Sequence, residues 1–159
     1  MSAAAWYQDR DARSLIAFGY LPFLGGLNLA WETAQLPLYT LWSEASAGTI
    51  AFSVAHCTAG DIAIGAAALI IVLILGRERA VAQWRWRRIA VWTALAGTAY
   101  TVFSEWSNTA ILGSWAYSGL MPTLEVAGID IGLSPLLQWL VLPPLALYLS
   151  RKSRRRRSA

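Results

Sequence analysis

Four apolar stretches, separated by short polar segments, dominate the pattern of hydrophobic and polar positions along this chain. Each stretch is close to the roughly 20 residues that a helix needs to cross the hydrocarbon core of a membrane. The pattern predicts helices over residues 14–35, 50–75, 89–112 and 131–149. We therefore expect an all-α protein in which a bundle of four transmembrane helices forms a single domain over residues 1–150. The basic tail, residues 151–159, follows this domain.

The composition is typical of a membrane protein rather than of a soluble domain. Of the 159 residues, 57% are hydrophobic and 14% are charged, whereas soluble domains carry about 25% charged residues. The chain has nine Trp and six Tyr residues, and these aromatic side chains accumulate where membrane meets water. The single Cys and the single His exclude an intrachain disulfide, CxxC redox chemistry and sites built from several imidazoles.

The positive charges predict the orientation of the helices. Lys and Arg are confined to the segments 10–13, 77–88 and 151–157, and the connections 36–49 and 113–130 contain neither. Because positively charged loops stay on the cytoplasmic side, we expect both chain ends in the cytoplasm and the protein in the inner membrane of a bacterium. We expect the Arg-rich tail to contact anionic lipid headgroups and not nucleic acid.

Polar side chains inside these helices or at their ends are the most informative residues. Such groups are costly at membrane depth, so they normally face the interior of a bundle. In the predicted orientation they all fall in the outer half of the membrane, whereas the inner half consists mainly of Leu, Ile, Val and Ala. The sequence therefore predicts a polar pocket lined from all four helices. Its residues are Asn28, Glu32, Gln35 and Tyr39, then His56 and Asp61, then Glu105 and Asn108, and finally Ser134 and Gln138.

Three carboxyl groups and one imidazole in a single pocket predict acid–base chemistry. Desolvation and mutual repulsion are expected to leave at least one of Glu32, Asp61 and Glu105 protonated at neutral pH, which is how a membrane-embedded general acid arises. No ExxH or HExxH spacing indicates a metal site, and the chain has no nucleophile elbow or phosphate-binding glycine loop. We therefore expect neither a metal nor another cofactor. A structural role remains open, in which the polar groups hold the helices together.

The end of the third predicted helix and the segment after it resemble known membrane enzymes. The residues concerned are Ser104-Glu105-Trp106-Ser107-Asn108-Thr109, Gly113-Ser114-Trp115-Ala116-Tyr117 and Gly128-Ile129-Asp130-Ile131-Gly132-Leu133-Ser134-Pro135. In layout this stretch of about 35 residues is similar to the membrane-integral lycopene cyclases and the membrane carotenoid hydratases. The resemblance implies that Glu105 protonates an isoprenoid double bond, and that Trp115 and Tyr117 line the pocket. The Pro-Glu-Glu start of a helix in the cyclases is replaced here by Ser134-Pro135-Leu136-Leu137-Gln138.

Two functions from different classes follow from these patterns. The first is an intramembrane enzyme, such as a cyclase, hydratase or isomerase, that acts on an isoprenoid or other lipid. Glu105 would be its acid, Asp61 and Glu32 the partner carboxylates, and His56 a proton relay. The second is a non-catalytic lipid- or ligand-binding subunit, working as a homo-oligomer or within a larger membrane complex. The substitution Glu105→Gln distinguishes the two functions. It should abolish turnover in an enzyme, but it should change only affinity or assembly in a binding subunit.

Overall fold

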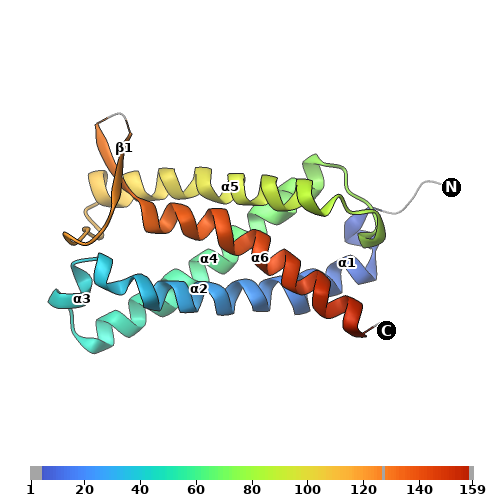
Figure 1. Cartoon of the computed structure of the whole chain (residues 1–159), viewed down its shortest axis with the longest axis horizontal. Helices are drawn as coiled ribbons and strands as arrows, with labels where there is room; N and C mark the ends of the chain where they lie inside the picture. Colours follow the sequence, from blue (N-terminus) through green and yellow to red (C-terminus); the bar gives the residue numbers. More distant parts are fainter. Residues whose placement is uncertain (1–4, 127, 158–159) are drawn as a thin grey trace.

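Long helices lying side by side make up most of the chain in this computed structural model, which describes residues 5–126 and 128–157. The long helices are α2 (Leu21–Gln35), α4 (Ala47–Leu75), α5 (Trp86–Trp106) and α6 (Leu133–Arg157). Helix α2 packs against α4 and α6, and α5 packs against the same two helices, so that α2 and α5 face each other across the group. Figure 1 shows their long axes running in the same general direction.

Short elements extend and connect these helices. Helix α1 (Arg10–Leu15) continues through a π-helical turn, η2 (Ile16–Tyr20), directly into α2, and it is preceded by the 3-10 turn η1 (Trp6–Gln8). The first connection contains the 3-10 turn η3 (Leu36–Leu38) and the short helix α3 (Leu41–Glu44). The connection between α4 and α5 contains η4 (Val81–Gln83), and a π-helical turn, η5 (Ser107–Ile111), prolongs α5.

Among the described residues, three helical segments are long and apolar enough to cross a membrane: Arg10–Leu38, Ala47–Leu75 and Leu133–Arg156. Helix α5 is not among them, because it begins with Trp86-Arg87-Arg88 and is interrupted by Thr, Ser, Gly and Glu residues. The prediction of a mainly helical protein with helices able to cross a membrane is thus confirmed in its coarse form.

A small β-hairpin departs from the purely helical prediction. Strand β1 (Thr123–Val126) pairs antiparallel with β2 (Ile129–Gly132), with Glu125 opposite Asp130. The turn includes Gly128 at a φ of 79°, a conformation that glycine adopts without a steric cost. The fourth helix was predicted to start at residue 131, but Ile131 belongs to β2 and α6 starts at Leu133. A short apolar run does not distinguish a strand from the start of a helix by its periodicity alone, which explains the error.

Side chains at the helix ends account for several boundaries. Ser46 caps α4, since its hydroxyl oxygen accepts a hydrogen bond from the N–H of Thr49 at 3.2 Å, as preferred cap residues do. Asp9 caps α1 and also accepts a hydrogen bond from the N–H of Val81 at 2.7 Å. That second bond ties the start of the chain to the connection between α4 and α5. Gly113, at a φ of 60°, ends the helix that contains η5.

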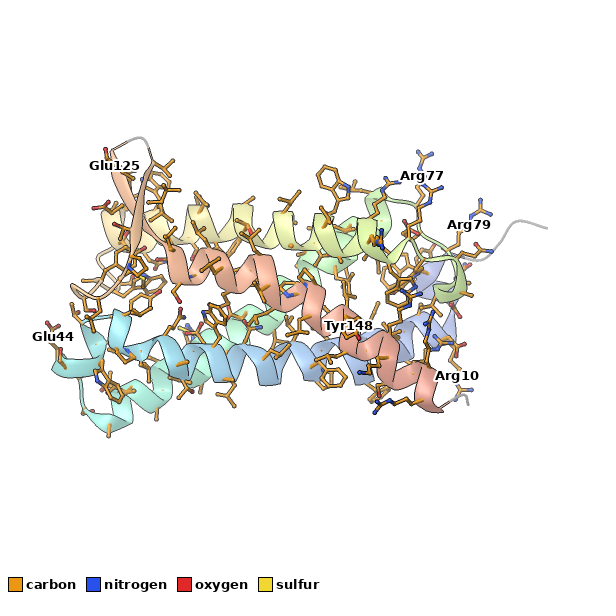
Figure 2. All side chains as sticks on the ribbon, in the orientation of Figure 1. Arg10, Glu44, Arg77, Arg79, Glu125 and Tyr148 are labelled. Carbon is orange, nitrogen blue, oxygen red and sulfur yellow. The ribbon has the colours of Figure 1, made fainter. Side chains whose placement is uncertain are left out.

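The two ends of the bundle differ in chemistry. The buried apolar core lies toward the end that contains α1, and it is built around Tyr20, Leu24, Leu69, Leu73 and Leu147. Figure 2 shows Arg10, Arg77 and Arg79 at this same end and Glu44 and Glu125 at the opposite one. Figure 1 places α3 and the hairpin at the acidic end. At the basic end, Arg154 forms an ion pair with Asp11 at 2.5 Å.

A close approach between α5 and α6 makes Gly97 sensitive to substitution. A Cβ atom at this position would overlap the six-membered ring of Trp139, and Trp139 is buried. We expect Gly97→Ala to lower the free energy of unfolding by about 1–3 kcal/mol, because overpacking forces neighbouring groups apart. Thermal unfolding of the purified protein in detergent measures the effect. Gly26→Ala in α2 is the control, since nothing lies within 4 Å of the added atom there, and an unchanged Gly97→Ala variant would contradict the packing described.

Candidate functional site

A cavity of about 880 Å³ lies in the acidic half of the bundle. It is lined from α2, α4, α5 and α6, and also from the connections that join them at this end. Its rim is open, because exposed side chains such as Phe52 and His56 contribute to its wall. The pocket residues proposed from the sequence that line it are Glu32, Gln35, Tyr39, His56, Asp61, Glu105, Asn108, Trp115 and Gln138.

Gln138 of α6 lies at the centre of the polar network beside this cavity. Its side-chain nitrogen Nε2 lies 2.8 Å from Oδ1 of Asn28, 2.9 Å from Oε1 of Glu32 and 2.9 Å from Oδ2 of Asp61. These three acceptors come from α2 and α4. An amide nitrogen carries two hydrogens, so the three acceptors compete for them. The shared donor also holds the carboxyl groups of Glu32 and Asp61 next to each other.

A second branch of the network joins α2 to the start of α6. Gln35 donates through Nε2 to Oε1 of Glu32 at 2.9 Å, and its carbonyl oxygen accepts from the hydroxyl of Ser134 at 2.7 Å. The indole N–H of Trp31 donates to the oxygen of Ser134 at 3.2 Å. Ser134, Asn28 and Tyr117 were expected to line the pocket, but they are not part of its wall. Through their hydrogen bonds they instead fix the positions of side chains that do line the cavity.

Glu105 of α5 belongs to a separate group on the cavity wall. The hydroxyl of Tyr117 donates a hydrogen bond to Oε2 of Glu105 and accepts one from the N–H of Gly132 at 3.0 Å. Tyr117 thereby connects the carboxyl group to the end of β2, directly before α6. The buried indole N–H of Trp115 interacts electrostatically with the same carboxyl group, without hydrogen-bond geometry to any described residue. Glu105 itself is only 5% exposed.

The segment that follows α5 closes over the acidic end of the bundle and docks on the residues after α2. The rings of Tyr39 and Tyr117 lie 5.8 Å apart between their centroids. Burial and then the charges of Glu105 and Glu32 raise the pKa of Tyr39 above its usual range. Burial and the hydrogen bond to Glu105 raise the pKa of Tyr117 in the same way. Both phenols therefore keep their protons at neutral pH. The backbone hydrogen bonds between the two segments are Thr40 N–H to Ala116 and Ser118 N–H to Leu38.

His56 and Asn108 line the cavity wall, as expected, but they lie outside the two hydrogen-bonded groups described above. The ring of His56 is exposed and stacks on Phe52, with 5.7 Å between the ring centroids. Within the part of the chain that the structure describes, His56 has no hydrogen bond to Glu32, Asp61 or Glu105. The amide nitrogen of Asn108 donates to the carbonyl oxygen of Ser104, one turn back in its own helix, at 2.8 Å.

The described residues contain no group of three or more His, Cys, Asp and Glu side chains arranged to hold a metal ion. The three carboxyl groups nevertheless line one cavity from three helices, and each is hydrogen-bonded to Gln138 or Tyr117. The arrangement can exchange protons with a bound molecule and can stabilise positive charge. Its hydrogen bonds can also hold the helices together.

Several residues of the cavity wall were not predicted from the sequence to line the pocket. Thr101 and Ser104 lie on the same side of α5 as Glu105 and Asn108, and their spacing of three or four residues was available as a signal. Aromatic residues were harder to assign, because Trp and Tyr are common near membrane surfaces in any case. The aromatic residues of the wall that were not assigned to the pocket from the sequence are Phe52 and Tyr100.

A scan against protein-family models, a search of curated proteins and a search of solved structures each found no match to this chain.

Proposed function

We propose that this protein is an intramembrane enzyme that acts on an isoprenoid or other lipid by acid–base chemistry. The observation that carries the proposal is the convergence of carboxyl groups from α2, α4 and α5 on one open cavity. Cavities of about 300–1,000 Å³ are the usual size for small-molecule sites. A cavity of about 880 Å³, in a chain whose helices are long and apolar enough to cross a membrane, can take up a large part of a lipid molecule.

Glu105 is the proposed acid. Its oxygen Oε2 accepts the hydrogen bond from Tyr117, so Oε1 is the oxygen that carries the proton to the substrate. The proton adds to one carbon of an alkene, and the positive charge develops on the neighbouring carbon. The aromatic ring of Trp115, on the cavity wall, stabilises that charge. Loss of a proton from an adjacent carbon, or addition of water, then completes the reaction.

Glu32 and Asp61 are the proposed partner carboxylates that receive a proton when the cation collapses. Gln138 holds both of them, so either group can accept the proton without losing its position. His56 has an exposed ring on the cavity wall. It is the proposed relay, because an imidazole exchanges protons with water at neutral pH.

The proposed membrane arrangement has four spans with both chain ends in the cytoplasm. Helix α5 packs between α4 and α6, and it exposes Val91, Trp92, Leu95 and Phe103. Such side chains suit contact with lipid. The basic segments gather at one end of the bundle (Figure 2), which becomes the cytoplasmic end by the positive-inside rule. This arrangement puts the cavity in the outer half of the membrane of a bacterial cell.

Cysteine labelling tests this arrangement. In a Cys57→Ser background, Ala82→Cys lies before α5 and Gly119→Cys lies after it, and both sites are exposed. We expect a membrane-impermeant maleimide to label Gly119→Cys in intact cells and Ala82→Cys only after permeabilisation. Equal accessibility of the two sites in intact cells would show that α5 does not cross the membrane.

The second candidate function is a non-catalytic lipid- or ligand-binding subunit, as a homo-oligomer or in a larger complex. The network around Gln138 favours it, since Glu32 and Asp61 both accept hydrogen bonds that link α6 to α2 and α4. Polar side chains that cross-link helices in this way stabilise membrane bundles without any catalytic role. A subunit of this kind would hold bound lipid that never changes chemically.

Solvent deuterium distinguishes the two functions. The purified full chain in lipid nanodiscs is incubated with bacterial lipid extracts in heavy water, and the lipids are analysed by mass spectrometry. Because the acidic proton of Glu105 exchanges with solvent, protonation of an alkene places a deuterium on carbon. We expect a lipid product that carries one carbon-bound deuterium and forms only with the protein. A product without carbon-bound deuterium would exclude alkene protonation, and unchanged lipids would favour the binding subunit.

A further inference from the structure

The formal charges on the cavity wall are almost entirely negative. The acidic residues that line it are Glu32, Glu44, Asp61 and Glu105. No Lys or Arg is among the described residues of the wall, where His56 is the only basic side chain. A phosphate or diphosphate group entering this cavity would therefore meet carboxyl groups instead of the Arg and Lys side chains that normally bind it.

Five aromatic rings also line this wall. They come from the connection after α2, from α4, from α5 and the segment after it, and from α6. The face of an aromatic ring attracts a cation, and the attraction grows when water is excluded. Carboxylates and ring faces thus favour the same sign of charge in a bound molecule. The rings concerned are Tyr39, Phe52, Tyr100, Trp115 and Trp139.

The described Lys and Arg residues lie outside the cavity wall, toward the opposite end of the bundle. They belong to residues 10–13, 77–88 and 151–157. Figure 1 places these segments at the end of the bundle away from α3 and the hairpin. These residues could bind an anionic headgroup, but a lipid held there would not contact the carboxyl groups of the cavity.

We propose that the cavity binds amphiphiles whose headgroup is a positively charged nitrogen, an amine or a quaternary ammonium, and rejects those that carry phosphate. This inference rests on the proposed function and narrows its substrate class to lipids without an anionic headgroup. An ammonium group held at the carboxylates also mimics the positive charge that develops when an alkene is protonated. Mimics of a transition state bind an enzyme more tightly than substrates do.

Binding of three matched probes tests the inference. The probes are decyltrimethylammonium, decyl maltoside and decyl phosphate, which share one chain and differ in headgroup charge. The full chain is purified in a neutral detergent, and saturable binding of each radiolabelled probe is measured by equilibrium dialysis. We expect the ammonium probe to bind at least about tenfold more tightly than the phosphate probe.

A pair of double variants assigns the effect to the cavity. Glu32→Gln with Asp61→Asn neutralises two carboxylates of the wall and keeps their side-chain shapes. Glu125→Gln with Asp130→Asn makes the same chemical change on the exposed hairpin, outside the wall. We expect the first double variant to lose at least about tenfold in affinity for the ammonium probe, and the second to bind as the unsubstituted protein does.

The possible outcomes separate this inference from the proposed function. Equal or tighter binding of the phosphate probe would overturn the cationic preference and leave an enzyme acting on lipids in place. Equal losses in the two double variants would place the effect on the surface and overturn the assignment to the cavity. If none of the probes binds saturably, both the inference and the lipid-binding part of the proposed function are wrong. The probe comparison in the unsubstituted protein does not depend on the folding of any variant.

Discussion

Glu105→Gln is expected to slow lipid conversion by about 10²–10⁴-fold, the usual contribution of a general acid. Glutamine has nearly the same shape, and its carbonyl oxygen can still accept the hydrogen bond from Tyr117. It has no proton acidic enough for an alkene. We therefore expect the variant to fold and to retain bound lipid while deuterium incorporation is lost. Mass spectrometry measures the rate of deuterium incorporation for the original protein and for the variant, and the ratio of the two rates gives the effect.

The control for this experiment is Glu125→Gln. Glu125 is exposed on β1, away from the cavity wall, so the variant has the same change in net charge without touching the proposed acid. We expect it to incorporate deuterium at the original rate. Undiminished incorporation in Glu105→Gln would remove Glu105 from the proposed role. A matching loss in Glu125→Gln would show that net charge, and not this carboxyl group, controls the reaction.

Gln138→Leu is expected to lower the free energy of unfolding by about 2–5 kcal/mol. The substitution removes the donor to Asn28, Glu32 and Asp61 together. Each buried acceptor left without a partner costs about 1–3 kcal/mol, and an unpaired buried charge costs more. Leucine has a similar volume, so the effect reports lost hydrogen bonds rather than a large cavity. Unfolding of the purified protein in detergent, followed by circular dichroism, measures it.

Gln83→Leu provides the matched control for the lost hydrogen bonds. Gln83 is exposed in η4 at the opposite end of the bundle, where a substitution changes stability by no more than about 0.5 kcal/mol. Adding Asp61→Asn to Gln138→Leu should recover part of the loss, because the new side-chain amide can donate to Glu32 and the substitution removes one charge. Additive effects of the two substitutions, or a Gln138→Leu variant as stable as the original, would contradict a linking role for this network.

The helices and the grouping of the polar residues were predictable from the sequence. Apolar runs of the right length marked α2, α4 and α6 directly, because a membrane span must be continuous. Glu32, Gln35 and Tyr39 recur at intervals of three and four residues, which puts them on one face of a helix. The confinement of Lys and Arg to three segments then assigned all these faces to the same end of the bundle.

The contacts between those residues were not predictable in the same way. Gln138 was one polar residue among several, and nothing in its spacing indicated that it would contact side chains from both α2 and α4. The hydrogen bond between Tyr117 and Glu105 depends on how the segment after α5 folds back, which helical periodicity does not describe. The hairpin before α6 was missed for a related reason, since Ile129-Asp130-Ile131 is too short to separate a strand from a helix by pattern.

The most direct test of the central claim is mass spectrometry of the lipids that copurify with the original protein and with Glu105→Gln. Intramembrane acid–base catalysis predicts the same isoprenoid or related lipid in both preparations, chemically altered only in the original one. That result would identify the substrate and the product together. Only bulk phospholipid in both preparations would contradict a specific lipid substrate and leave a structural or subunit role as the better account.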